Sequence, residues 1–260
     1  MEVLVYILLF NLFGSVISLF GGVLLLLNRN FSHSVSHYLS SFAAGTLLGA
    51  AFFDLLPEAL GEGEHAGIKI ITIFSWTLTG ILFFFLIERF LHWFHHHGYE
   101  DHEATGKPTI PLIVIGDTIH NFIDGIAIAA TFMLSIPLGI VTTFAVAAHE
   151  IPQEIGDFGI MLKNGLSRKK ILTVNIGSAL ASFIGAVLAF YFIEQVEGLT
   201  AIFLSLTAGF FLYIALSDLI PEIHHENKKG LALWETTCLL AGVIVMYLAI
   251  LILENSLGGH

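Results

Sequence analysis

Long apolar segments set the fold of this chain. Each is close to the roughly 20 residues that a helix needs to cross the hydrocarbon core of a bilayer, which is about 30 Å thick. Hydrophobic residues make up 56% of the 260 residues and charged residues only 12%, about half the charged share of an average soluble domain. Eight such spans follow one another, over about 3–27, 38–60, 68–91, 110–134, 137–162, 171–193, 199–221 and 231–254. The sequence therefore predicts an all-α integral membrane protein, with residues 1–260 forming one transmembrane domain.

The composition excludes several function classes. A mean hydropathy of +0.85 is outside the range of water-soluble enzymes and of disordered chains. A formal net charge of −11 disfavours nucleic-acid partners, because phosphate binding needs Lys and Arg. A single cysteine, Cys238, rules out an internal disulfide framework. The lipid bilayer is thus the first predicted partner.

Basic residues predict how the chain is oriented. Nine of the ten Lys and Arg residues fall in alternate connections, and only Lys69 falls on the other side. Because positive residues stay cytoplasmic, this distribution predicts that both termini lie outside. The short connections favour the cell membrane, either an inner or a plasma membrane, over an organelle.

Two segments of the chain repeat each other. Ala44-Gly45 is followed nine residues later by Asp54-Leu55-Leu56-Pro57-Glu58, and Ala208-Gly209 is followed at the same distance by Asp218-Leu219-Ile220-Pro221-Glu222. The offset is 164 residues, and the segments end the second and seventh spans, which run in opposite directions. An inverted repeat of spans 1–3 and 6–8 around spans 4 and 5 is typical of alternating-access transporters.

The fourth and fifth spans contain most of the intramembrane polar residues. In span four, Asp117, His120, Asn121 and Asp124 are spaced i, i+3, i+4 and i+7, which places them on one helical face. In span five the polar residues form two adjacent rows. One row holds His149, Gln153 and Asp157, and the other holds Glu150 and Glu154.

The negative charges of five acids in these two spans need to be neutralised within the membrane. At about 2.5–3.5 kcal/mol for each intramembrane charge, five charges cost roughly 12–17 kcal/mol. Basic residues are almost absent from the spans. Carboxylate, imidazole and amide oxygen together suit zinc or another divalent transition metal better than calcium or magnesium. Protonated acids or hydrogen bonds between helices are the alternative, most of all for Asp117 and Glu154 taken singly.

Two motifs resemble a known family. His120-Asn121-Phe122-Ile123-Asp124-Gly125 and the segment that runs from His149 to Asp157 are similar to the helix-four and helix-five signatures of the ZIP (Zrt/Irt-like) divalent metal transporters. The resemblance covers essentially the whole chain and is that of a bacterial-type member with HNxxDG and HExPHE-like signatures. It implies transport of zinc, and also of cadmium, iron or manganese, toward the cytosol. It further implies a 3+2+3 arrangement of spans, a homodimer and no enzymatic activity.

The resemblance also implies the metal ligands. A first site falls on His120, Asp124, His149 and Gln153. A second site falls on Asn121, Asp124, Glu150 and Gln153, with Asn175 or Ser178 of span six as a further ligand. Gln153 departs from the signature, which has histidine there. Glutamine carries no charge and cannot bridge two metals as a carboxylate does, so either one or two ions are expected.

Further residues are candidates along a metal path. Acids at the outer end of span two favour cation entry, and ligands at the inner end of span seven accept a departing ion. The path candidates are Asp54, Glu58, Asp117, Glu154, Asp157, Asn175, Asp218, Glu222, His224 and His225. A cytosolic loop over 92–109 holds His92, His95, His96, His97 and His102, and clustered histidines of this kind bind zinc loosely. Ordinary water-facing helix ends and a solvated loop are the alternatives.

Three other functions compete with metal import. An intramembrane zinc protease uses HExxH, but the second histidine is absent after His149 and Pro152 disrupts the turn. A metal exporter of the cation-diffusion type has an HxxxD pair like His120 and Asp124, but six spans and a soluble domain. A membrane metal sensor that does not transport would share the same ligands, and only metal flux separates it from a carrier.

Overall fold

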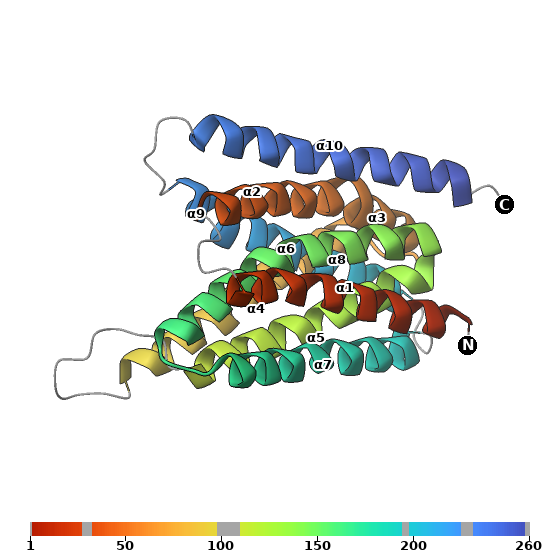
Figure 1. The fold of residues 1–260 in the computed structure, drawn as a ribbon. Helices are drawn as coiled ribbons and strands as arrows, with labels where there is room; N and C mark the ends of the chain where they lie inside the picture. Colours follow the sequence, from red (N-terminus) through yellow and green to blue (C-terminus); the bar gives the residue numbers. More distant parts are fainter. Residues whose placement is uncertain (1, 28–32, 98–109, 194–197, 225–230, 258–260) are drawn as a thin grey trace.

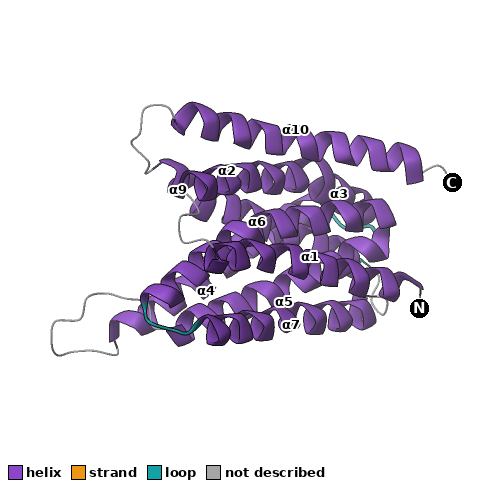
Figure 2. Ribbon diagram, in the orientation of Figure 1, coloured by secondary structure: helices purple, strands orange, loops and turns teal. Residues whose placement is uncertain are grey.

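The computed structural model describes residues 2–27, 33–97, 110–193, 198–224 and 231–257, and within them every regular element is a helix (Figures 1 and 2). The ten α-helices are α1 (Glu2–Leu27), α2 (His33–Ala50), α3 (Leu56–His65), α4 (Ile70–His97), α5 (Ile110–Leu134), α6 (Ile136–Lys163), α7 (Arg168–Ile193), α8 (Leu199–Tyr213), α9 (Ile220–His224) and α10 (Leu231–Leu257). Two π-helical segments, η1 (Ala51–Leu55) and η2 (Ile214–Leu219), join α2 to α3 and α8 to α9.

Seven helical stretches are long and apolar enough to cross a membrane. They cover Glu2–Val23, His37–His65, Ile70–Phe90, Ile113–Leu134, Arg168–Ile193, Leu199–Leu219 and Ala232–Leu253. The remaining predicted span, 137–162, corresponds to α6, which has 28 residues. Helix α6 is long enough to cross but is not among the seven, because its polar residues, from His149 to Asp157, lower its hydropathy.

Helix α4 differs from the sequence expectation. It continues to His97, so His92, His95, His96 and His97 lie on its last turns instead of in a loop. The physical reason is that no glycine or proline occurs between Gly80 and Gly98. His102 and the rest of the predicted loop lie outside the described residues.

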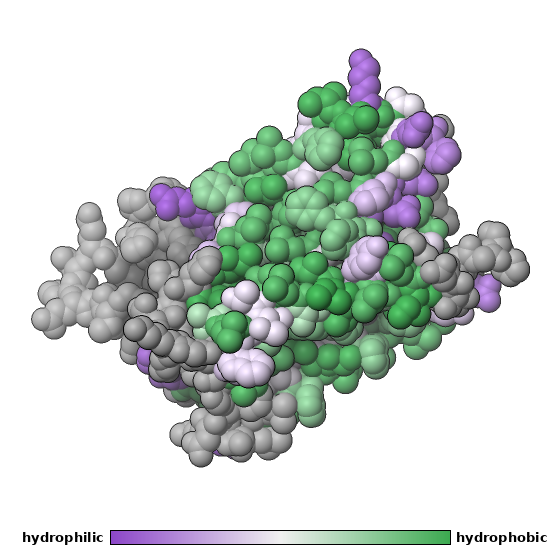
Figure 3. Space-filling model, turned by 90° about the horizontal axis from the view of Figure 1, so that it is seen from above, coloured by the Kyte–Doolittle hydropathy of each residue, from purple (hydrophilic) through white to green (hydrophobic). Residues whose placement is uncertain are grey.

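The outer surface is strongly apolar. In the view of Figure 3, hydrophobic side chains cover most of the described face, and hydrophilic ones gather toward its ends. Leu233, Trp234 and Phe20 are among the large side chains that are more than half exposed. An apolar surface of this extent needs an apolar solvent, as a bilayer supplies.

The two repeated segments share an unusual local structure. The Leu56 amide donates to Ala51 O in η1, and the Ile220 amide donates to Ala215 O in η2. Both are i to i−5 bonds, and both come directly before a proline, Pro57 or Pro221, which has no amide hydrogen to donate. Donors and acceptors are related by the same 164-residue offset as the sequence repeat.

Equivalent glycine contacts join the helices that flank these segments. A Cβ atom on Gly45 of α2 would lie 2.0 Å from the Leu239 carbonyl oxygen of α10. A Cβ atom on Gly209 of α8 would lie 2.2 Å from the Thr77 carbonyl oxygen of α4. Gly45 and Gly209 are themselves 164 residues apart. Both contacts bring two helix backbones together in a way that only glycine permits.

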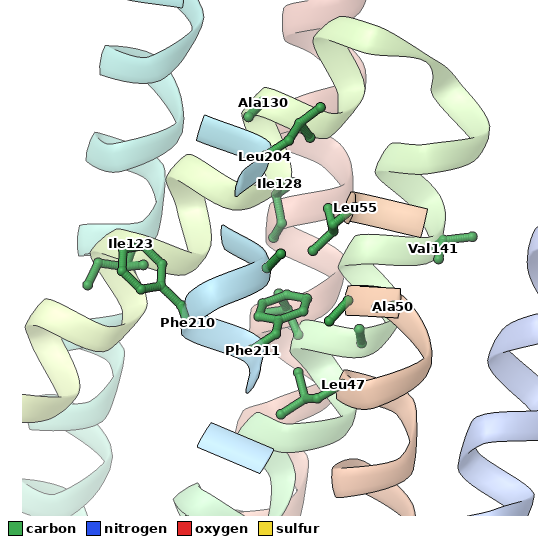
Figure 4. Close-up of a cluster of buried hydrophobic side chains, with 14 of the residues drawn as sticks. Leu47, Ala50, Leu55, Ile123, Ile128, Ala130, Val141, Leu204, Phe210 and Phe211 are labelled. Carbon is green, nitrogen blue, oxygen red and sulfur yellow. The ribbon is translucent and has the colours of Figure 1, made fainter. Parts of the chain in front are cut away.

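Helices α5 and α6 pack against each other. Helix α5 packs along α7, where a Cβ atom on Gly125 would lie 1.8 Å from the Ser182 carbonyl oxygen. Helix α6 packs along α1. The buried apolar core includes Leu47, Leu55, Ile128, Leu204 and Phe211 (Figure 4), which come from α2, η1, α5 and α8. Helices α5 and α6, which contain the polar residues, therefore contribute to this core as well.

Candidate metal centre

Helix α5 buries its whole polar face. Asp117, His120, Asn121 and Asp124 are each less than 8% exposed. His149 and Glu150 of α6 are buried as well, at 1% and 4% exposure. Side chains at i, i+3, i+4 and i+7 share one side of a helix, and here that side meets α6 instead of lipid.

Four of these side chains bring their ligand atoms together. One possible ligand atom from each of His120, Asp124, His149 and Glu150 lies within 4.8 Å of the others. His120 Nε2 lies 3.0 Å from His149 Nε2 and 3.7 Å from Glu150 Oε1. Asp124 Oδ2 lies 3.3 Å from His149 Nε2 and 3.7 Å from His120 Nε2.

A hydrogen bond to the backbone determines which ring nitrogen of His149 faces the other three ligand residues. His149 Nδ1 lies 3.1 Å from the Ala145 carbonyl oxygen. A carbonyl oxygen only accepts, so Nδ1 donates and a neutral ring presents the lone pair of Nε2. That lone pair faces Asp124 Oδ2, which is buried and has no hydrogen-bond partner among the described residues. Lone pairs that converge in this way are stabilised by a cation between them.

No lysine or arginine occurs in α5, and the one in α6, Lys163, is its last residue. The sequence contains no Lys or Arg between Lys107 and Lys163, a stretch that includes all of α5. Aromatic rings flank the two histidines, with Phe84 at 5.3 Å from the His120 ring and Phe211 at 6.0 Å from the His149 ring. The surroundings have low polarity, so attraction between a divalent cation and these carboxylates is weakly screened.

A second group of acids lies beside the first. Asp117, Glu150 and Glu154 also place ligand atoms within 4.8 Å of one another, and all three are buried. Asn121 Nδ2 donates to Asp117 Oδ1 at 2.9 Å, and the Ser178 hydroxyl of α7 donates to Asp117 Oδ2. Glu150 belongs to both groups.

Other predicted ligands lie outside these two groups. Gln153 and Asp157 of α6 are half-buried. Asn175 is fully buried, but its amide donates to the Ile171 carbonyl oxygen at 2.8 Å. Of the two candidates on α7, Ser178 is therefore the one that reaches the acids of α5.

The path candidates are spread over the two repeated segments. Asp54 in η1 is buried, Glu58 in α3 is half-buried, and Asp218 in η2 is exposed. Glu222 and His224 lie on α9, with side-chain positions outside the description, and His225 lies outside the described residues. The side chains of the four histidines on α4 are likewise outside the description.

Two polar contacts between helices were not expected from the sequence. His37 Nδ1 of α2 lies 3.4 Å from Glu235 Oε1 of α10, and both side chains are buried. Tyr213 of α8 donates its hydroxyl hydrogen bond to Glu88 Oε2 of α4. The available signal was an acid within a predicted apolar span, as Glu235 is within 231–254 and Glu88 within 68–91.

These observations define a class: a helical membrane protein with a buried cluster of imidazole and carboxylate groups that suits a divalent metal. Residues 1–111 and 103–250 match the family described as ZIP Zinc transporter. The chain belongs to the ZIP family, which confirms the family that the sequence resembles. This family consists of transporters and not of enzymes.

Individual relatives carry zinc transporter names. Zinc transporter ZIP13 of Pongo abelii is 36% identical over 224 residues, which are 81% of this chain and 65% of that protein. Zinc transporter ZIP13 of Mus musculus is 32% identical over 83% of this chain and 70% of its own length. Zinc transporter ZIP10 of Homo sapiens is 37% identical over 52% of this chain. The chain spans 17% of that ZIP10, and so its relatives include much longer proteins.

Proposed function

We propose that this chain carries divalent metal cations, zinc foremost, across a membrane through the centre between α5 and α6. The observation that supports this proposal most is the buried group of His120, Asp124, His149 and Glu150, whose ligand atoms lie within 4.8 Å of one another. Two imidazoles and two carboxylates suit borderline ions such as zinc, and also cadmium, ferrous iron or manganese to differing degrees.

The charges of the group fit a divalent cargo. Two ionised carboxylates offset the two positive charges of the ion, and two neutral imidazoles add ligands without adding charge. Asn121 and Gln153 are further candidate ligands in a centre that takes one or two ions. Gln153 follows His149 by four residues and therefore lies one helical turn away.

Alternating access is the mode of transport that the inverted repeat favours. The support is the matched pair of π-helical segments and the matched pair of glycine contacts. The architecture that the family resemblance implies has eight spans in a 3+2+3 arrangement. The metal ion then crosses a cell membrane toward the cytosol. Both termini lie outside, and the working unit is a homodimer.

Acids and histidines at the two ends of the centre extend the path. Asp54 and Glu58 are the candidate residues for entry, and Asp218, Glu222, His224 and His225 are the candidates for exit. Asp117, Glu154, Asp157 and Asn175 are candidates near the centre itself. His92, His95, His96, His97 and His102 would buffer the metal that has arrived in the cytosol.

Metal uptake into proteoliposomes that hold the purified full chain tests this function. A series of zinc, cadmium, ferrous iron and manganese should give saturable uptake, with zinc transported most efficiently. Asp124→Asn should bind and transport little metal. Metal binding without metal flux would instead indicate a metal sensor. Metal flux that occurs only when protons flow in the opposite direction would indicate an exporter.

A further inference from the structure

Asp117, Glu150 and Glu154 form a compact group of carboxylates, of which Glu150 alone also belongs to the histidine group. Their ligand atoms lie within 4.8 Å of one another. Each of the three residues is at most 4% exposed. Glu154 follows Glu150 by one turn of α6, and Asp117 precedes His120 by one turn of α5. The group is therefore one turn nearer to Lys163, at the end of α6, than the histidine centre is.

The hydrogen bonds around the group leave one oxygen of Glu150 and one oxygen of Glu154 without a partner among the described residues. Both donors that reach it, the Asn121 amide and the Ser178 hydroxyl, are directed to Asp117. Glu150 Oε1 and Glu154 Oε2 are buried and accept no hydrogen bond from any residue that the structure describes. Buried carboxylates at this separation repel one another unless a proton or a cation lies between them.

The geometry points to a second divalent-cation site, made of oxygen ligands only, at Asp117, Glu150 and Glu154. This set differs from the second site that the family resemblance implies, which uses Asn121, Asp124, Glu150 and Gln153. In the set proposed here Asn121 is a hydrogen-bond donor and not a metal ligand, because its amide nitrogen lies 2.9 Å from Asp117 Oδ1 and 3.0 Å from the Asp117 carbonyl oxygen. Glu150 lies in both groups and is therefore the bridging residue.

Oxygen-only sites prefer different ions from sites with imidazole. Carboxylate and hydroxyl oxygens suit manganese, magnesium or calcium, whereas imidazole suits zinc. This inference rests on the proposed transport function. Zinc that leaves the histidine centre toward the end of α6 enters a site that holds it less tightly, so it is released in two steps. A harder ion binds this second site in its own right.

A two-metal titration of the purified full chain tests this site. One equivalent of zinc occupies the histidine centre first, and manganese is then added while the loss of its free electron paramagnetic resonance signal is followed. The wild type should bind one manganese ion per chain in addition to zinc. Glu154→Gln, which keeps the size of the side chain, should lower manganese affinity at least tenfold and change zinc affinity less than twofold.

The controls separate this site from the histidine centre. Glu64→Gln makes the same chemical change on an exposed residue of α3 and should leave both metals unaffected. His149→Ala should weaken zinc binding while manganese still binds at the carboxylates. If Glu154→Gln does not give a monodisperse protein, Asp117→Asn serves the same purpose.

Two outcomes would overturn the oxygen-only site. One is a wild type that binds zinc and no manganese beside it. The other is a Glu154→Gln protein that binds manganese as tightly as the wild type does. By contrast, failure of the wild type to bind zinc at all would count against the proposed transport function.

Discussion

His120 Nε2 and His149 Nε2 face each other across the α5–α6 interface at 3.0 Å. Two imidazole nitrogens that bind one tetrahedral zinc ion at about 2.0–2.1 Å are roughly 3.3 Å apart. The two rings therefore need to separate by only a few tenths of an ångström to hold the same ion. Because the His149 ring is also anchored to the Ala145 carbonyl oxygen, most of this movement falls to His120.

Asp124 is the first residue to test. It lies against both histidines, at 3.3 Å and 3.7 Å, and its Oδ2 atom points into the group. Asp124→Asn keeps the shape but removes the charge, so zinc affinity should fall by about 100-fold or more, beyond the loss typical of outer-shell changes. Equilibrium dialysis and vesicle uptake measure the two effects. Near-normal uptake by a correctly inserted protein would contradict the proposed centre.

A substitution of Gln153 should strengthen zinc binding instead of weakening it. Glutamine is a harder and weaker zinc ligand than imidazole, and Gln153 lies one turn beyond His149 on α6. Gln153→His should therefore tighten zinc binding, by about tenfold if the new ring reaches the ion, and raise the zinc-to-manganese ratio. Competition binding on the purified protein checks both. An unchanged affinity and ratio would show that residue 153 does not ligate the metal.

The glycine contact between α2 and α10 should control stability. A Cβ atom on Gly45 would lie 2.0 Å from a backbone oxygen, which cannot move aside alone. Gly45→Ala should destabilise the fold by about 1–3 kcal/mol. Gly177→Ala is the matched control, because a Cβ atom there meets nothing within 4 Å. Thermal unfolding in detergent compares them, and equal unfolding temperatures would argue against the close contact.

The pair formed by His37 and Glu235 should couple α2 to α10. Removing one partner of a buried pair costs more than removing both, so Glu235→Gln and His37→Gln should show a coupling of about 0.5–3 kcal/mol in a double-mutant cycle. Denaturant unfolding of the four proteins gives this value. Thr236→Ala, at an exposed neighbouring position, controls for general effects on α10. Additive effects would mean that the contact contributes nothing specific.

Membrane orientation can be read with thiol labelling. Glu64 in α3 and Ser167 before α7 are both exposed, and these segments lie at opposite ends of the bundle (Figure 1). In a Cys238→Ala background, Glu64→Cys should react with an impermeant reagent from outside only, and Ser167→Cys from inside only. The positive residues beside Ser167 are the reason for this orientation. Labelling of both positions from one face would refute it.

The local features of the chain could be read from its sequence. Apolar length predicts the membrane helices, and the spacing of Asp117, His120, Asn121 and Asp124 predicts a single polar face, because both properties depend only on residues near in sequence. The repeat of Asp54 to Glu58 at Asp218 to Glu222 likewise corresponds to two segments with the same π-helical bonds. The end of α4 was harder to predict from the sequence, because the absence of a helix-ending residue is weaker evidence than its presence.

Contacts between helices were decided by the tertiary structure alone. Helical periodicity does not fix the rotation of one helix against another. That rotation depends on distant backbone contacts such as Gly125 with Ser182. It brings Glu150 into both ligand groups, places Ser178 instead of Asn175 against Asp117, and joins His37 to Glu235. The sequence by itself determined which residues are costly to bury in a bilayer, and only the packing of the helices decided which of them stabilise one another.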